Sequence, residues 1–327
     1  MMADLTTEYL GLKLRNPIIV GSSGLTAAAA GVREAALAGA GAVVLKSIFE
    51  EEIALEHEEA MAGAVRRGAS REAWEYYDYE LRGRTLAQYA DLIREARSEA
   101  GIPVIASVNC SWSHEWTQYA RAIEDAGADA LELNMYFLPS DLARSSEERE
   151  LAYFSVVERV RTAVRIPIAL KISPYFTSLG RVIQRLSRSG VQGLVLFNRF
   201  ASLDFDLEKV TLAAGSPLST SAELGTSLRW VALMANRVSC DLCASTGVTD
   251  GAAVVKQVLA GARAVEVVSA FYRGGLGHVR RMLADVEQWM AAHDYSTVAG
   301  FRGRLSQAAS EDPAAFERVQ FLKRYGG

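Results

Sequence analysis

Two lysines and three asparagines stand inside or at the ends of short apolar segments of this chain. They are Lys46, Lys171, Asn109, Asn134 and Asn198. A buried ammonium group is costly unless it is paired, so each lysine needs a partner. One explanation is a salt bridge to a core carboxylate such as Glu132, and the other is an anion or an electron-rich ring bound nearby. Amides and ammonium groups together supply the donors and acceptors that suit a planar polar heterocycle.

Small residues follow several of the apolar segments. The first segment leads into Ser22, Ser23 and Gly24, which let a flat ligand approach the backbone N–H groups, and Ser47 follows Lys46. The last two segments end in Ser245, Thr246 and Gly247 and in Ser269 and Ala270. Backbone N–H groups in such turns bind phosphate in parallel α/β folds. The alternative is an ordinary turn with a helix cap, because Thr249–Asp250 also resembles a plain helix start.

These residues recur because one unit recurs: a short apolar run, a polar residue, an amphipathic stretch, and a glycine. The apolar runs predict strands at Pro17–Ser22, Ala42–Ser47, Pro103–Asn109, Ala130–Asn134, Pro167–Ser173, Gly193–Asn198, Asp241–Ser245 and Ala264–Ser269. The amphipathic stretches predict helices at Thr26–Leu37, Thr85–Arg97, Ser113–Asp125, Ser145–Val164, Ser178–Ser189, Ala222–Val238, Asp250–Leu259 and Leu276–His293. Eight alternating pairs favour a (β/α)₈ TIM barrel over an open doubly wound sheet.

Three segments are expected to decorate this single domain of residues 1–327. Residues 4–16 predict a small N-terminal hairpin that plugs the N-terminal end of the barrel. Residues 49–84 and 199–221 predict long loops after strands 2 and 6, where loops usually cover a binding site. The acidic run at residues 50–52 is expected to be a solvated face, and we expect no metal site.

Composition excludes some classes of partner. The chain has 327 residues, half of them hydrophobic, and a formal net charge of −4, which gives no basic footprint for nucleic acid or an anionic membrane.

The chain's three cysteines, Cys110, Cys240 and Cys243, are too few for a disulfide framework. Cys240 and Cys243 have redox-motif spacing, but they fall at the entry to a buried strand. With no signal peptide visible, we expect a cytoplasmic protein.

Several ordered motifs resemble one family. They are LGLKLRNPIIVGSSG, GAVVLKS, ASVNCSWSHEWTQYARAIEDAGADALELN, IPIALKISPYF, LVLFN and LAGARAVEVVSAFYRGG. In this order they are similar to the class 1 dihydroorotate dehydrogenases and to the pyrimidine-oxidising domain of dihydropyrimidine dehydrogenase. The resemblance implies an FMN-binding barrel, often a homodimer, that removes two hydrogens from a dihydropyrimidine. It leaves the electron acceptor open, and an electron-transfer partner subunit is one of the options.

The resemblance also assigns roles by position. The flavin ring would be lined by Ser22, Ser23 and Gly24, and its pyrimidine edge would be polarised by Lys171. Near flavin and substrate would lie Lys46 and Ser47, and contacts to flavin or substrate would come from Asn109, Asn134 and Asn198. The phosphate would be held by Ser245, Thr246, Gly247, Ser269 and Ala270. Among these, Lys46 and Asn134 are also candidate catalytic residues.

The chain departs from the family after Asn134. The family's loop there carries a Cys or Ser that takes a proton from the substrate, but here Phe137 stands at that position and Phe cannot act as a base. Ser140 is our candidate for the base, with Tyr136 second. Three functions therefore stay open. They are a dihydroorotate dehydrogenase-like oxidoreductase, a flavin-binding member with another substrate or an electron-transfer subunit, and a Schiff-base lyase or aldolase using Lys171 or Lys46.

Overall fold

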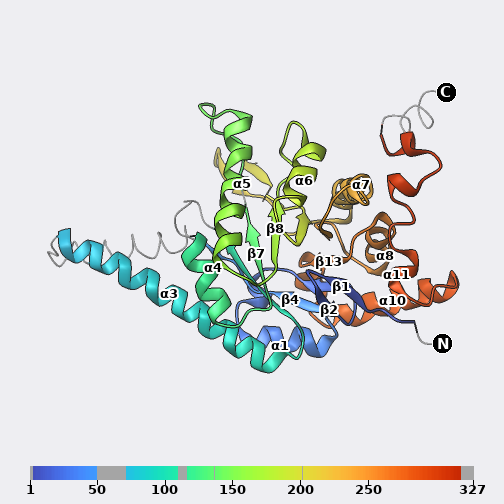
Figure 1. The fold of residues 1–327 in the computed structure, drawn as a ribbon, viewed down its shortest axis with the longest axis horizontal. Helices are drawn as coiled ribbons and strands as arrows, with labels where there is room; N and C mark the ends of the chain where they lie inside the picture. The colour runs from blue at the N-terminus through green and yellow to red at the C-terminus, as the bar shows by residue number, and fades with distance from the viewer. Residues whose placement is uncertain (1–2, 50–70, 110–115, 136, 201, 318–327) are drawn as a thin grey trace.

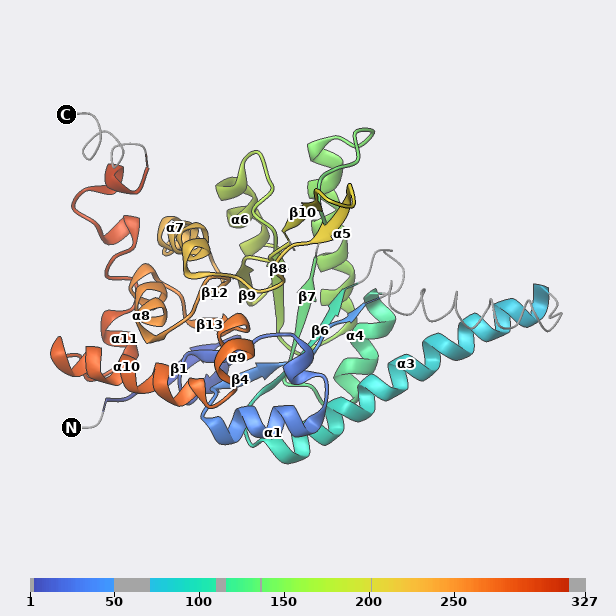
Figure 2. The ribbon, with the colours of Figure 1, turned by 180° about the vertical axis from the view of Figure 1, so that it is seen from behind.

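The computed structural model describes residues 3–49, 71–109, 116–135, 137–200 and 202–317. Within these residues, eight parallel strands close into a barrel (Figures 1 and 2). They are β3 (Ile18–Val20), β4 (Ala42–Val44), β6 (Val104–Asn109), β7 (Ala130–Asn134), β8 (Ile168–Ile172), β9 (Gly193–Leu196), β12 (Asp241–Ser245) and β13 (Ala264–Val267). Pairing of β13 with β3 and of β4 with β6 closes the ring, so the TIM barrel is confirmed and the open sheet is excluded. The short β5 (Ile48–Phe49) also pairs with β6.

Helices cover the outside of the barrel. They are α1 (Ala29–Ala38), α3 (Arg71–Ala100), α4 (Trp116–Asp125), α5 (Ser146–Ala163), α6 (Leu179–Ser187), α7 (Leu224–Met234), α8 (Gly251–Ala260), α9 (Ser269–Gly274), α10 (His278–Ala292) and α11 (Val298–Phe301). Gly39 ends α1 with a φ of 106° and Gly261 ends α8 with a φ of 128°, as the Gly-after-helix pattern predicts.

One helix is longer than predicted. We expected it to begin at Thr85, but α3 begins at Arg71, so the end of the predicted long loop is helical. Figures 1 and 2 show this first part of α3 projecting away from the barrel. The aromatic residues of this part, Trp74, Tyr76, Tyr77 and Tyr79, are spread around a helix and do not mark one face, so no amphipathic pattern indicated a helix there. The predicted Ser113 cap and the acidic run at 50–52 lie outside the described residues.

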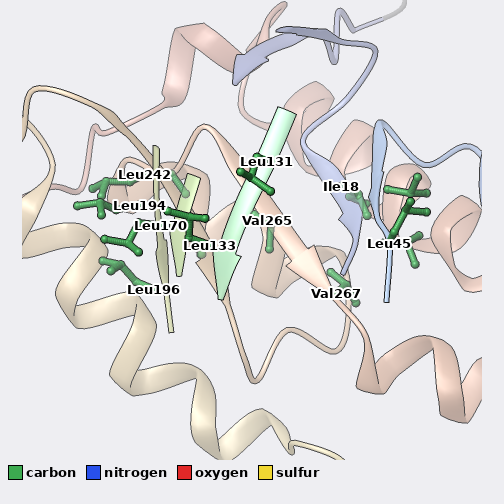
Figure 3. Close-up of a cluster of buried hydrophobic side chains, with 14 of the residues drawn as sticks. Ile18, Leu45, Leu131, Leu133, Leu170, Leu194, Leu196, Leu242, Val265 and Val267 are labelled. Atoms are coloured by element: carbon green, nitrogen blue, oxygen red, sulfur yellow. The ribbon is translucent and has the colours of Figure 1, made fainter. Parts of the chain in front are cut away.

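Alternation along the strands separates two apolar layers. Side chains such as Leu131, Leu170 and Val265 belong to the main core cluster, which includes the covering helices (Figure 3). Their neighbours in sequence, such as Ala130, Ala169 and Ala264, form a second cluster with the N-terminal hairpin. Because consecutive strand residues point to opposite faces, this second cluster is the interior of the barrel.

The N-terminal hairpin closes one end of that interior. β1 (Thr7–Tyr9) and β2 (Leu12–Leu14) pair antiparallel, and Tyr9, Leu10 and Leu14 are buried in the interior cluster. The Leu10 N–H donates to Asp241 Oδ2 over 2.9 Å, and Thr7 Oγ1 donates to the Arg263 carbonyl over 3.0 Å. The predicted plug is therefore present at this end of the barrel, and the cavity described below opens at the other end, where the strands finish.

A second hairpin follows β9, inside the segment 199–221 that we expected to be a long loop. β10 (Leu203–Asp206) and β11 (Thr211–Ala214) pair antiparallel there. Several of its apolar side chains are exposed, including Phe205 and Leu212. Among the described residues, none of the helices combines the length and apolar character needed to cross a membrane.

Candidate active site

A cavity of about 420 Å³ opens at the carboxyl ends of the barrel strands. This volume lies within the roughly 300–1,000 Å³ typical of small-molecule sites. Most of the predicted site residues line it: Ser22, Ser23, Gly24, Lys46, Ser47, Asn134, Lys171, Asn198, Ser245, Thr246, Gly247 and Ser269. In the described part of the chain, three predicted residues are not in the cavity wall: Asn109, Ser140 and Ala270. Asn109 and Ala270 are buried at the end of β6 and in α9, whereas Ser140 is exposed.

Three ionisable groups meet at the floor of the cavity. Lys171 Nζ on β8 lies 2.5 Å from Glu266 Oε2 on β13 and 3.6 Å from Glu132 Oε1 on β7. All three side chains are buried inside the barrel. Burial disfavours the charge of Lys171, but the two carboxyl groups outweigh burial and raise the pKa of its ammonium group. Lys171 is thus both salt-bridged in the core and part of the cavity wall, so the two explanations of this lysine are compatible.

Burial also acts on Glu132. It raises the pKa of this carboxyl well above its ordinary value, and repulsion from Glu266 adds to the effect, while Lys171 opposes it. Glu266 was not predicted from the sequence. The signal for it was available, because Glu266 interrupts an apolar strand at an inward position, as Glu132 and Lys171 do.

A row of serines connects this cluster to the cavity wall. Ser22 Oγ lies 3.0 Å from Ser47 Oγ, and Ser47 Oγ lies 2.7 Å from Ser107 Oγ. Ser107 Oγ contacts Glu132 Oε1 at 3.4 Å, and these two residues face each other in the β6–β7 register. Tyr89 fixes Ser107 through two hydrogen bonds to its backbone, of 2.9 and 3.0 Å. Ser107 was missed because one small hydroxyl side chain inside a mostly apolar strand does not show which face of the strand it lies on.

The asparagine amides lie beside the charged cluster. Asn134 Nδ2 donates to Ser47 Oγ over 3.4 Å, but Asn134 Oδ1 is buried and accepts no hydrogen bond from the described residues. A buried acceptor of this kind normally has a donor, so it is available to a ligand in the cavity. Asn198 Nδ2 donates to the backbone carbonyls of Met135 and Lys171 over 3.2 and 3.4 Å.

The opposite end of the cavity is made of hydroxyl groups and backbone. Ser219 donates to Ser269 Oγ from its N–H over 2.9 Å and from its Oγ over 3.1 Å. The Gly247 N–H donates in turn to Ser219 Oγ over 3.3 Å. Thr246 has a φ of 76°, which is rare for a β-branched residue and marks a constrained turn. A Cβ at Gly247 would lie 2.2 Å from the Leu224 N, so only glycine fits this wall.

Residues 67–290, more than half of the chain, match the family model described as dihydroorotate dehydrogenase. The chain belongs to the dihydroorotate dehydrogenase family. This is a family of flavin-dependent oxidoreductases, so the resemblance seen in the sequence is confirmed.

Relatives carry names from more than one branch of the family. A protein of Thermoplasma acidophilum, named dihydroorotate dehydrogenase B (NAD(+)), catalytic subunit, is 24% identical over 92% of this chain and 99% of its own length. A putative dihydroorotate dehydrogenase A (fumarate) of Aeropyrum pernix is 30% identical over 64% of this chain and 68% of its own. The chloroplastic dihydropyrimidine dehydrogenase (NADP(+)) of Arabidopsis thaliana is 23% identical over 93% of this chain and 77% of its own.

The loop that distinguishes this member of the dihydroorotate dehydrogenase family follows β7. Phe137 packs edge-on against Tyr153 of α5 with ring centroids 5.5 Å apart, and Tyr153 packs in the same way on Phe176 at 5.2 Å. Burial raises the pKa of Tyr153 to about 12. Ser140 is exposed in this loop and does not line the cavity. Tyr136 lies outside the described residues.

Two chemistries weighed from the sequence are not favoured. A Schiff-base lysine must lose its proton to attack a carbonyl, but the paired carboxyl groups keep Lys171 protonated and raise its pKa. The cysteine pair is structural, because Cys243 is buried in the interior cluster and Cys240 precedes β12. Burial raises the pKa of both thiols, to about 12 for Cys240, and this suppresses the reactive thiolate. Cys110 lies outside the described residues.

Proposed function

We propose that this chain binds FMN and oxidises dihydroorotate or a related dihydropyrimidine. The proposal rests on one observation: the two ends of a single cavity in the barrel offer different kinds of binding group. One end offers amides and the Lys171 ammonium group, and the other offers hydroxyls and close backbone around Gly247. A flavin mononucleotide has the matching pair of ends, a polar heterocycle and a phosphate.

Two features of the structure fit this cofactor. Asn134 Oδ1 is a buried acceptor that a ring N–H can satisfy. Gly247 lets the turn after β12 pack against the backbone at the start of α7, because a Cβ there would lie 2.2 Å from the Leu224 N, and this packing brings backbone N–H groups to one end of the cavity. Ser22, Ser23 and Gly24 would lie along the ring; Ser47, Asn134, Asn198 and Lys171 would surround its polar edge; and Ser245, Thr246, Gly247 and Ser269 would hold the phosphate. When bound, FMN supplies the hydride acceptor of the reaction.

The protein's contribution is a fixed charge and a proton acceptor. Lys171 is held rigidly by Glu266, so its positive charge meets negative charge at the polar edge of a bound ring without reorganisation. Lys46 would lie near the substrate at the cavity wall. We retain Ser140 as the base that takes the substrate proton, with the condition that the loop after β7 brings its hydroxyl over the cavity.

Partners follow from the relatives. Several of them are named catalytic subunits of an NAD-dependent enzyme, which supports a partner subunit that receives the electrons of this chain. The family resemblance also supports a homodimer.

The test is spectroscopic. The purified full-length protein is mixed with FMN, separated from free FMN, and examined for a flavin spectrum; a protein that retains no flavin contradicts the proposal. The loaded protein is then treated with dihydroorotate without oxygen, and bleaching of the flavin absorbance identifies the substrate. Dihydrouracil is compared in parallel, because the Phe137 departure and the dihydropyrimidine dehydrogenase relative favour testing this second substrate. Bleaching by dihydrouracil alone would assign the chain to that branch.

A further inference from the structure

The buried charges at the cavity floor do not balance if every group is ionised. Glu132 and Glu266 carry two carboxyl groups, and Lys171 carries one ammonium group. Among the described residues, Tyr9 from the hairpin, Tyr89 from α3 and Cys243 from β12 also interact electrostatically with Glu132, and these weak acids supply no positive charge. An uncompensated charge buried inside the barrel is very costly, so one carboxyl group keeps its proton.

Geometry decides which carboxyl group this is. Glu266 lies 2.5 Å from the Lys171 ammonium, whereas Glu132 is 3.6 Å away. The closer carboxyl group gains more from the positive charge and therefore stays ionised. Glu132 is also the one whose Oε1 faces a hydroxyl group, Ser107 Oγ, at 3.4 Å.

From Glu132 the hydroxyl groups lead without interruption to the cavity. The oxygen-to-oxygen distances are 3.4 Å to Ser107, then 2.7 Å to Ser47, then 3.0 Å to Ser22, which lines the cavity. A serine hydroxyl can donate one hydrogen bond and accept others, so a row of serines can reverse its direction as a unit. We propose that Glu132 stores a proton and that Ser107, Ser47 and Ser22 carry it between the barrel interior and a ligand in the cavity.

The transfer balances. A basic nitrogen or oxygen of a bound heterocycle takes the hydroxyl proton of Ser22, and Ser22 then takes one from Ser47. Ser47 takes one from Ser107, and Ser107 takes the carboxyl proton of Glu132. Each serine ends with one proton, the acceptor has gained one, and Glu132 has become a carboxylate that faces Lys171 at 3.6 Å. The reverse sequence reloads Glu132. This relay depends on the cavity and the barrel interior, and it does not depend on which cofactor binds.

Infrared spectroscopy of the full-length protein tests whether the Glu132 carboxyl group holds a proton. The neutral wild-type protein should show the carbonyl stretch of a protonated carboxylic acid, and Glu132→Gln should lose it. Glu147→Gln, which removes an exposed carboxyl group on α5, should keep it. Ser107→Ala should shift its frequency, because Ser107 contacts Glu132 and has no hydrogen bond to Glu266 among the described contacts. Absence of the band from the wild type, or its persistence in Glu132→Gln, would overturn the proposal.

Exchange kinetics test the relay. After transfer into D₂O, the band should shift quickly in the wild type. In Ser107→Ala and Ser22→Ala the exchange should slow by at least about tenfold, because it must then wait for local opening of the barrel. Ser23→Ala is the matched control: Ser23 also lines the cavity, but its Oγ donates to the Gly21 carbonyl and is outside the row. If Ser107→Ala does not fold, the half-buried Ser22 provides the same test. Unchanged exchange in Ser22→Ala would overturn the relay.

Discussion

The ammonium nitrogen of Lys171 lies 2.5 Å from a carboxylate oxygen of Glu266, across the interior of the barrel. The two residues are 95 positions apart and come from β8 and β13. Their contact places a fixed positive charge between the N-terminal plug and the cavity. Stability and ligand binding therefore depend on the same group.

Replacing Lys171 with Met should destabilise the protein strongly. It leaves Glu132 and Glu266 facing each other inside the barrel without a cation. We expect the free energy of unfolding at neutral pH to fall by about 3–5 kcal/mol, as for other broken buried ion pairs. Urea denaturation measures this. Lys209→Met on the exposed hairpin is the control and should change little; equal losses in both variants would contradict the buried cluster.

The stability of the wild type should depend on pH through Glu132. Its pKa is raised in the folded protein, so the folded state holds a proton that the unfolded state loses above the ordinary carboxyl pKa of 4.5. Stability should therefore decrease as pH rises from about 5 to about 7, with a contribution of up to about 1.4 kcal/mol per pH unit. Glu132→Gln should remove this contribution and give a shallower curve. Parallel curves for the two proteins would be inconsistent with the raised pKa.

Gly247→Ala should distort the phosphate end of the cavity. The new Cβ would lie 2.2 Å from the Leu224 N, and the φ of 79° disfavours alanine. We expect FMN affinity, measured by fluorescence titration, to fall by at least about tenfold and stability to fall as well. The control is Gly225→Ala in α7, where a Cβ meets nothing within 4 Å. That variant should bind FMN normally and gain about 0.4–1 kcal/mol.

Leu14→Ala should weaken the plug of the barrel. Leu14 is fully buried with Tyr9 and Leu10 in the interior cluster. We expect the free energy of unfolding to fall by about 2–5 kcal/mol, the usual result of a cavity in a core. Leu37→Ala on α1, whose leucine is 70% exposed, should change it by less than about 0.5 kcal/mol. A plug that only rests on the barrel would give the same small value for both variants.

Ser140→Ala tests the proposed base. Loss of general-base catalysis should slow flavin reduction by the true substrate by at least about 100-fold. Stopped-flow absorbance of the loaded protein gives this rate, and Ser155→Ala, an exposed serine on α5, serves as the control. A Ser140→Ala rate equal to that of the control would exclude Ser140 as the base.

The sequence predicted the barrel well because its strands are buried on both faces and several of them follow a helix that ends in glycine. The residues at strand ends, such as Asn134 and Ser245, were found because polar side chains after apolar runs are conspicuous. Ser107 was not found, because a mostly apolar run does not show which alternate positions face inward. Glu266 was also missed, although a carboxyl group that interrupts an apolar strand is a signal that the sequence offers. The long α3 was missed in part, since the aromatic residues of its first half are spread around the helix and do not mark one face. Packing of Phe137 on Tyr153 depends on α5, which no local pattern around Phe137 contains.

The N-terminal plug has a consequence for how this chain is made. Thr7 and Leu10 are synthesised before their hydrogen-bond partners Arg263 and Asp241, which follow 256 and 231 positions later. The nascent chain therefore carries its apolar hairpin without these partners while the intervening strands and helices are made. The plug can seal the barrel only after β12 and β13 have been made, and until then the apolar side chains of the hairpin lack their final contacts.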